Sequence, residues 1–154
     1  MFDVSEMSEL YFEDLKVGDR YQSEPYEVTE SAILDFAREF DVQPFHLDDE
    51  VAKKSVFNGL AASGWHTAAI AMRLFTTGPL QFVGGAIGLG VDELRWPAAV
   101  RPGDTLRLET EIMELRPSRS KPGQGLIRIR NVTSNQRGEV VLSYFANAMV
   151  QRRP

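Results

Sequence analysis

The chain has 154 residues, of which 43% are hydrophobic and 10% aromatic, so it is long enough to bury the core of one globular domain. Its net charge of −5 and its scattered basic residues exclude the cationic surface that nucleic acids and anionic membranes attract, so we expect neither as a partner. The chain has no cysteine, which excludes disulfides, thiolate metal sites and cysteine nucleophiles.

The sequence carries no recognisable targeting or membrane signal. The start, "MFDVSEMSELYFEDL", is acidic and lacks the basic and apolar regions of a secretory signal. No window approaches the roughly 18 unbroken apolar residues of a membrane span. We therefore expect a cytoplasmic protein with one domain over residues 1–154, in which residues 1–10 form a loose arm.

The first elements are a weak strand and a helix. Residues 21–28 are typical of a strand, and Pro25 within them indicates a sheet edge or a bulge. Thr29 is a suitable N-cap for a helix. Apolar residues then recur at the spacing of one buried helix face: Ile33, Phe36, Ala37 and Phe40. Pro44 disfavours helical angles at the residue before it, so this helix should end near Phe40 and be followed by a turn over residues 41–47.

Two further helices are predicted. A short one runs from Asp48 to about Ser55, with acidic residues in its first turn where the helix dipole favours them. The second is capped by Ser63 and runs from Gly64 to about Thr76, where the glycine and proline at positions 78 and 79 end it. Its residues leave little polar face, so we expect protein to surround it.

From residue 82 onward the hydrophobic period changes from helical to two, which predicts four antiparallel strands. Their alternating sets are Ile87, Leu89 and Val91; Leu106, Leu108, Thr110 and Ile112; Ile127 and Ile129; and Val140, Leu142, Tyr144, Ala146, Ala148 and Val150. The turns "RPGD" and "NQRG" separate strands. A curved antiparallel sheet wrapped around the long buried helix accounts for both patterns. This is the hot-dog fold of the α+β class, and its uncovered edges predict self-association.

The stretch "FDVQPFHLDD" places Asp41 and His46 on one proline-restricted turn. Histidine can take and give a proton near neutral pH, so the two side chains form a candidate acid/base pair. The alternative is that Asp41 caps local backbone amides and His46 packs beside the next helix.

The stretch "SGWH" begins the buried helix. The amide of Gly64, after Ser63, is open to close approach at a partly positive helix N-terminus, which suits an oxyanion or a thioester carbonyl. The alternative is an ordinary capped helix in which the glycine only relieves crowding. His66, the other histidine, is expected to be partly buried with its hydrogen bonds satisfied.

Two other kinds of site are disfavoured. His46, His66, Asp48 and Asp49 lack the close histidine spacing of helical zinc motifs, so we expect no metal. The stretch "GGAIGLG" at residues 84–90 lacks the G-x-G-x-x-G spacing of dinucleotide-binding loops. We expect it to be a close-packed strand that borders a cavity.

The stretch "FAREFDVQPFHLDDEVA", residues 36–52, resembles the hydratase signature of the MaoC-like (R)-specific enoyl-CoA hydratases. Asp41, Pro44, His46 and Ala52 fall on its landmarks, and "ASGWHTAAIAMRL", "RPGDTL" and "NQRGEVV" are also similar to that family. The sequence departs from the signature at Phe40, where a glycine is usual, and at Gln43, where asparagine is usual. Ser63 stands where many members have histidine.

The resemblance implies a hot-dog homodimer that adds water reversibly to a trans-2-enoyl-CoA and gives an (R)-3-hydroxyacyl-CoA. It implies that Asp41 and His46 are the catalytic pair, that Gly64, with Ser63 beside it, binds the thioester oxygen, and that no cofactor is needed. Two alternatives remain: a hot-dog acyl-CoA thioesterase, and a non-catalytic acyl-CoA-binding protein of the same fold.

Overall fold

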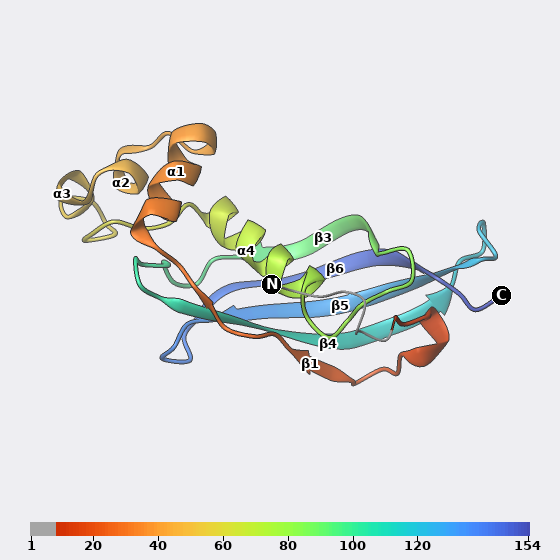
Figure 1. The fold of residues 1–154 in the computed structure, drawn as a ribbon. Helices are drawn as coiled ribbons and strands as arrows, with labels where there is room; N and C mark the ends of the chain where they lie inside the picture. Colours follow the sequence, from red (N-terminus) through yellow and green to blue (C-terminus); the bar gives the residue numbers. More distant parts are fainter. Residues whose placement is uncertain (1–8) are drawn as a thin grey trace.

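The computed structural model describes residues 9–154 and consists of an antiparallel sheet with a long helix lying against it (Figure 1). Within these residues the sheet has six strands: β1 (Arg20–Gln22), β2 (Tyr26–Glu27), β3 (Ile87–Arg95), β4 (Thr105–Pro117), β5 (Gln124–Ser134) and β6 (Val140–Gln151). Their order is β1-β4-β5-β6-β3, and β2 also pairs with β4. Residues 1–8 of the predicted arm lie outside the described residues. Leu10, at the end of that arm, forms a bridge with Phe82.

Helix α4 (Gly64–Thr76) is the long helix of the fold, and its bounds are those that the sequence predicts. The Ser63 hydroxyl caps it by accepting a hydrogen bond of 3.2 Å from the Trp65 amide. Ile70 and Leu74 on its buried side pack into a core shared with residues of β4. An antiparallel sheet with such a helix against one face is the predicted hot-dog fold of the α+β class.

The prediction that protein surrounds α4 is wrong for the single chain. The sheet covers only one side of the helix, so Trp65 remains 60% exposed and Met72 53% exposed. Apolar side chains at the surface also mark β3, where Ile87, Leu89 and Val91 are each more than half exposed. Because β3 is the last strand in the sheet order, its outer edge is unpaired among the described residues.

Helix α1 (Glu30–Phe40) lies at one end of the sheet, next to the start of α4 (Figure 1). Thr29 caps it, as predicted, by accepting a hydrogen bond of 3.2 Å from the Ala32 amide. Ile33 and Ala37 are buried, but Phe40 is 67% exposed, so its predicted burial is wrong. The hydrophobic period identifies a helix face correctly, but α1 projects past the sheet, and its last turn has no sheet beneath it.

The two short helices after α1 differ from the prediction: one was not expected, and the other is shorter than expected. Pro44–Leu47 is a one-turn helix, α2, where the sequence analysis expected only a turn. Proline has the backbone angle of a first helical residue, which accounts for a start at Pro44. Helix α3 spans only Asp49–Ala52, and Asp48 caps it. A 3-10 turn, η2 (Phe12–Asp14), completes the helical elements of the described chain.

Candidate active site

Asp41 and His46 are brought together by the end of α1 and the one-turn helix α2. The Asp41 amide donates to the Ala37 carbonyl at 3.0 Å, which closes the last turn of α1. The chain then reverses, because the Gln43 amide donates to the Asp41 carbonyl at 2.8 Å. His46 follows on α2, and its Nε2 lies 3.4 Å from Oδ2 of Asp41. This separation is longer than a strong hydrogen bond.

The second ring nitrogen of His46 fixes the position of the proton. Nδ1 lies 2.6 Å from the carbonyl oxygen of Ala61, and the ring is buried. A carbonyl oxygen can only accept, so Nδ1 carries the proton. In the neutral ring, Nε2 therefore holds a lone pair on the side of Asp41. This is the state that a proton acceptor requires.

The carboxylate of Asp41 receives two hydrogen bonds and is 16% exposed. The Ser63 hydroxyl donates to Oδ2 at 2.6 Å, and Nε2 of Gln43 donates to Oδ1 at 2.5 Å. Burial raises the pKa of Asp41, but these two hydrogen bonds and the nearby His46 together hold the pKa below its ordinary value. The carboxylate is thus ionised at neutral pH.

Ser63 and Gly64 have different surroundings at the start of α4. The Ser63 side chain is fully buried, and its hydroxyl bonds the Asp41 carboxylate and the Trp65 amide. The Gly64 amide has no acceptor among residues 9–154. A Cβ at Gly64 would lie 2.7 Å from Cε2 of Trp96, whose indole N–H donates to the Gly64 carbonyl at 2.8 Å. Only glycine fits against this ring.

A cavity of about 410 Å³ lies between α4 and strands β3, β5 and β6. Its wall on α4 is formed by Trp65, Ala68, Met72, Phe75 and Thr76. The glycine-rich stretch borders it, as predicted, but is not closely packed, because a Cβ at Gly85, Gly88 or Gly90 would meet nothing within 4 Å. Neither Asp41 nor His46 lines the cavity. It begins at Trp65, the residue after Gly64.

His66 differs from its expected state. It is buried, as expected, but Nδ1 has no hydrogen-bond partner among residues 9–154, so the expectation of satisfied hydrogen bonds is wrong. The ring stacks on Phe36 with centroids 4.8 Å apart and planes 8° from parallel. Burial lowers the pKa of His66 because it penalises the charged imidazolium.

The four residues considered as metal ligands do not gather. Asp48 caps α3, and Oδ1 of Asp49 accepts from the Leu60 amide at 2.9 Å. Nowhere in residues 9–154 do three histidine, cysteine, aspartate or glutamate side chains form a group that could hold a metal ion. In the same residues, no helix is long and apolar enough to cross a bilayer.

Sequence reasoning missed three groups of the site. Gln43 was noted only as a departure from the hydratase signature, although its place two residues after Asp41 is a local signal for a contact. The Ala61 carbonyl that holds His46, and Trp96 against Gly64, lie 15 and 32 residues from their partners. No local pattern marks contacts of that separation.

Comparison with known proteins identifies the family. The MaoC like domain matches residues 14–133. An (R)-specific enoyl-CoA hydratase of Rhodospirillum rubrum is 31% identical over 149 residues, which cover 93% of each chain. The crystal structure of a MaoC-like dehydratase from Rhodospirillum rubrum is 52% identical and superposes with a TM-score of 0.90, covering 94% of this chain and 99% of that one. A Mycobacterium tuberculosis protein with a double hot-dog fold has a TM-score of 0.79 at 24% identity, over 95% of this chain and 45% of that one. The chain therefore belongs to the MaoC-like family of hydratases and dehydratases.

Proposed function

We propose that this protein adds water reversibly to a trans-2-enoyl-CoA and gives an (R)-3-hydroxyacyl-CoA. The observation that carries the proposal is the approach of His46 Nε2 to Asp41 Oδ2, at 3.4 Å, beside the first turn of α4. Ser63 links the pair to that turn, because its hydroxyl bonds Asp41 and its chain neighbour is Gly64. The activity named for the Rhodospirillum rubrum hydratase, which matches along 93% of its length, supports the same reaction.

In this reaction Asp41 and His46 exchange protons with water and with the substrate. One of them takes a proton from a water molecule as its oxygen bonds Cβ. Neither group holds a proton to give beforehand, so the proton taken from water passes across the pair and the other group delivers it to Cα. The electron pair of the double bond moves toward the thioester and places negative charge on its oxygen. The Gly64 amide, at the positive end of α4, is the donor that stabilises this charge. No electron is gained or lost by the substrate, so the step requires no redox cofactor.

The acyl group has an apolar site next to this chemistry. The cavity of about 410 Å³ begins at Trp65 and continues along α4, so a thioester at the Gly64 amide would direct its acyl chain past the indole. Most of the cavity wall is apolar, which favours the transfer of hydrocarbon from water. The proposal therefore assigns this cavity to the acyl chain.

The active form is proposed to be a homodimer in the cytoplasm. The edge of β3, which is unpaired among residues 9–154, and the exposed Trp65 and Met72 of α4 form an apolar surface beside the cavity. A second copy of the chain would remove these side chains from water, as expected of a surface that a single chain leaves open. A dimer would also enclose the cavity, which excludes water from the acyl site.

The assay that tests the proposal supplies crotonyl-CoA to the purified protein and follows both the enoyl absorbance and free thiol. A hydratase removes the absorbance without releasing thiol, a thioesterase releases free CoA, and a binding protein does neither. The proton-transfer geometry of the pair favours the first outcome over the second. A release of thiol at the rate of substrate loss would replace the proposal with the thioesterase alternative.

Variants of the pair give the second arm of the test. Asp41→Asn and His46→Gln are each expected to slow hydration at least about a hundredfold, because each removes one of the two proton-transfer groups. Asp35→Asn is the matched control, since Asp35 is an exposed carboxylate on α1 whose one side-chain partner within residues 9–154 is Arg38. Near-normal hydration rates in both active-site variants, measured with the best enoyl-CoA substrate, would refute the assignment of Asp41 and His46 as the proton-transfer pair.

A further inference from the structure

The loop between α3 and α4 carries the carbonyl group that orients His46. Residues 57–63 form neither helix nor strand, and Asn58 and Gly59 have positive φ angles of 53° and 145°. The oxygen that accepts from His46 Nδ1 belongs to Ala61, in the middle of this loop. The state of the imidazole therefore depends on whatever fixes the loop.

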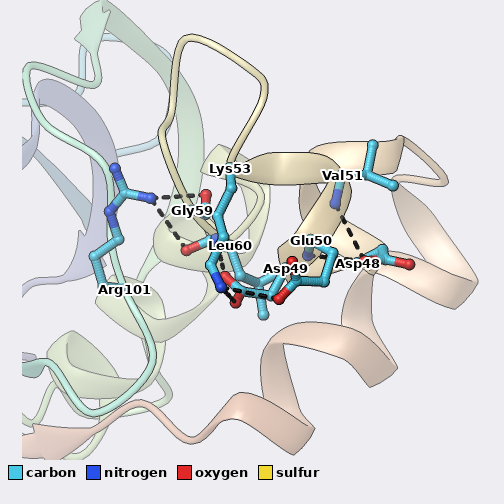
Figure 2. Close-up of polar contacts among 8 residues, drawn as sticks. All are labelled: Asp48, Asp49, Glu50, Val51, Lys53, Gly59, Leu60 and Arg101. Atoms are coloured by element: carbon cyan, nitrogen blue, oxygen red, sulfur yellow. Dashed lines mark hydrogen bonds and ion pairs between the residues drawn. The ribbon is translucent and has the colours of Figure 1, made fainter.

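The guanidinium of Arg101 binds this loop at three carbonyl groups. It donates to the carbonyl oxygens of Gly59 at 2.8 Å and Leu60 at 3.2 Å (Figure 2). It also donates to the carbonyl oxygen of Phe57. Leu60 is also held through its amide, which donates to Asp49 Oδ1 at 2.9 Å. The residue immediately before Ala61 is thus fixed at both its N–H and its C=O.

Arg101 is itself anchored to the sheet. Its amide donates to Oδ2 of the buried Asp104 at 2.9 Å, in the turn that leads into β4. Oδ1 of Asp104 accepts from Gln136 at 3.0 Å, in the turn between β5 and β6. The Ala62 amide donates to the carbonyl of Val100, the residue before Arg101, at 2.9 Å. Arg101 therefore joins the irregular loop to the turns of the sheet that flank β4, β5 and β6.

We propose that Arg101 is a positioning residue for His46. By fixing Leu60, it places the Ala61 carbonyl where it keeps the imidazole proton on Nδ1 and leaves the Nε2 lone pair facing Asp41. When the carbonyl moves away, the proton can occupy Nε2 instead and donate to the Asp41 carboxylate, so that the imidazole no longer offers a proton acceptor to the site. The effect on rate rests on the proposed hydratase function. The effect on the tautomer rests on the hydrogen bonds alone.

The test uses the full chain with ¹⁵N-labelled histidine. The chain has two histidines, so two imidazole rings are observed, and a His66→Gln variant assigns them. Above the pH of imidazole titration, the ¹⁵N shifts of His46 are expected to report a proton on Nδ1. In Arg101→Met we expect a mixture of tautomers and a fall in kcat of about tenfold or more, with a smaller change in KM. Arg101→Lys is expected to have a tautomer ratio and a kcat between those of the wild type and Arg101→Met, because one ammonium cannot reach three carbonyl groups.

Two controls separate positioning from general stability. Arg107→Met removes an exposed arginine of β4 that forms no ion pair within residues 9–154, and it is expected to leave the tautomer and kcat unchanged. Added guanidinium is expected to restore part of kcat to an Arg101→Ala variant, and to restore the Nδ1–H signal in the same titration. A contact that serves only folding would not produce this recovery.

Several outcomes would overturn the proposal. A folded Arg101→Met with the wild-type His46 shifts would do so, and so would a fall in kcat without a change of tautomer. Failure of both the methionine and the lysine variant to fold would also reject it, because Arg101 would then hold the whole domain. If the wild-type protein hydrates no enoyl-CoA, the proposed function fails, while the ¹⁵N measurement still decides whether Arg101 sets the tautomer.

Discussion

Replacing Ser63 by alanine removes one hydroxyl that serves both the fold and the site. The Ser63 oxygen caps α4 through the Trp65 amide, and its proton bonds Asp41 at 2.6 Å. Loss of a serine cap costs about 1 kcal/mol of unfolding free energy, and loss of a hydrogen bond to a charged group costs about 1.5–3 kcal/mol. For Ser63→Ala we therefore expect a loss of roughly 2–4 kcal/mol, since one atom makes both contacts.

Thermal unfolding and a pH–rate profile measure the two contributions. For a domain of this size each kcal/mol lowers Tm by about 2–4 °C, so Tm should fall by roughly 5–15 °C. The Asp41 pKa is held below its ordinary value in the folded state, so Ser63 stabilises the protein fully above about pH 4 and less as pH falls through the folded pKa. The difference in unfolding free energy between the wild type and Ser63→Ala should therefore shrink as pH falls through the folded-state pKa of Asp41. The acid limb of kcat/KM should move to higher pH in the variant.

Thr29→Ala is the matched control, because Thr29 caps α1 through the Ala32 amide and bonds no carboxylate in the described part of the chain. It should cost about 1 kcal/mol or less and leave the acid limb in place. If Ser63→Ala costs no more than Thr29→Ala and its acid limb does not move, the hydrogen bond to Asp41 contributes neither stability nor a lowered pKa, and the reasoning is refuted.

Three other predictions concern single side chains. Gly64→Ala should lower Tm and cut the hydration rate at least about tenfold, because the new Cβ meets the Trp96 ring at 2.7 Å; a second change, Trp96→Leu, should restore Tm. His66→Phe keeps the stack on Phe36 and removes the unpartnered Nδ1, so it should add about 1 kcal/mol of stability. That gain should grow as pH falls below about 6.5, because the lowered pKa of His66 costs the wild type stability there. Leu89→Lys, on the exposed edge strand, should shift the mass by light scattering from dimer to monomer with an unchanged circular dichroism spectrum.

The elements that were predicted correctly have strong local signals. Helix α4 begins and ends as expected because Ser63 is a good cap and the Gly78 and Pro79 pair is a strong stop. The strands follow from alternation, and Gly103 and Gly138 have the positive φ angles that their turns require. Phe40 was misplaced because periodicity shows which way a side chain points but not how far the neighbouring sheet extends.

The site was predictable only where its residues are close in sequence. Asp41 and His46 are five residues apart with Pro44 between them, so their meeting is a local property of one turn. Their hydrogen-bond partners are set by tertiary structure, as the bond from His46 to Ala61 shows. The roles of Gln43 and Ser63 as donors to Asp41 required the fold to be known, because each side chain also had an ordinary local interpretation.

The proposed reacting groups and the cavity wall come from different parts of the architecture. Asp41, His46 and the Gly64 amide belong to the helical end of the molecule, whereas the cavity is lined chiefly by β3, β5, β6 and one side of α4 along its length. Side chains of the sheet can therefore be exchanged without disturbing the proton-transfer geometry. For enzyme engineering, this separation means that libraries at Val91, Leu94 and Ala146 can vary acyl preference against a constant chemical step.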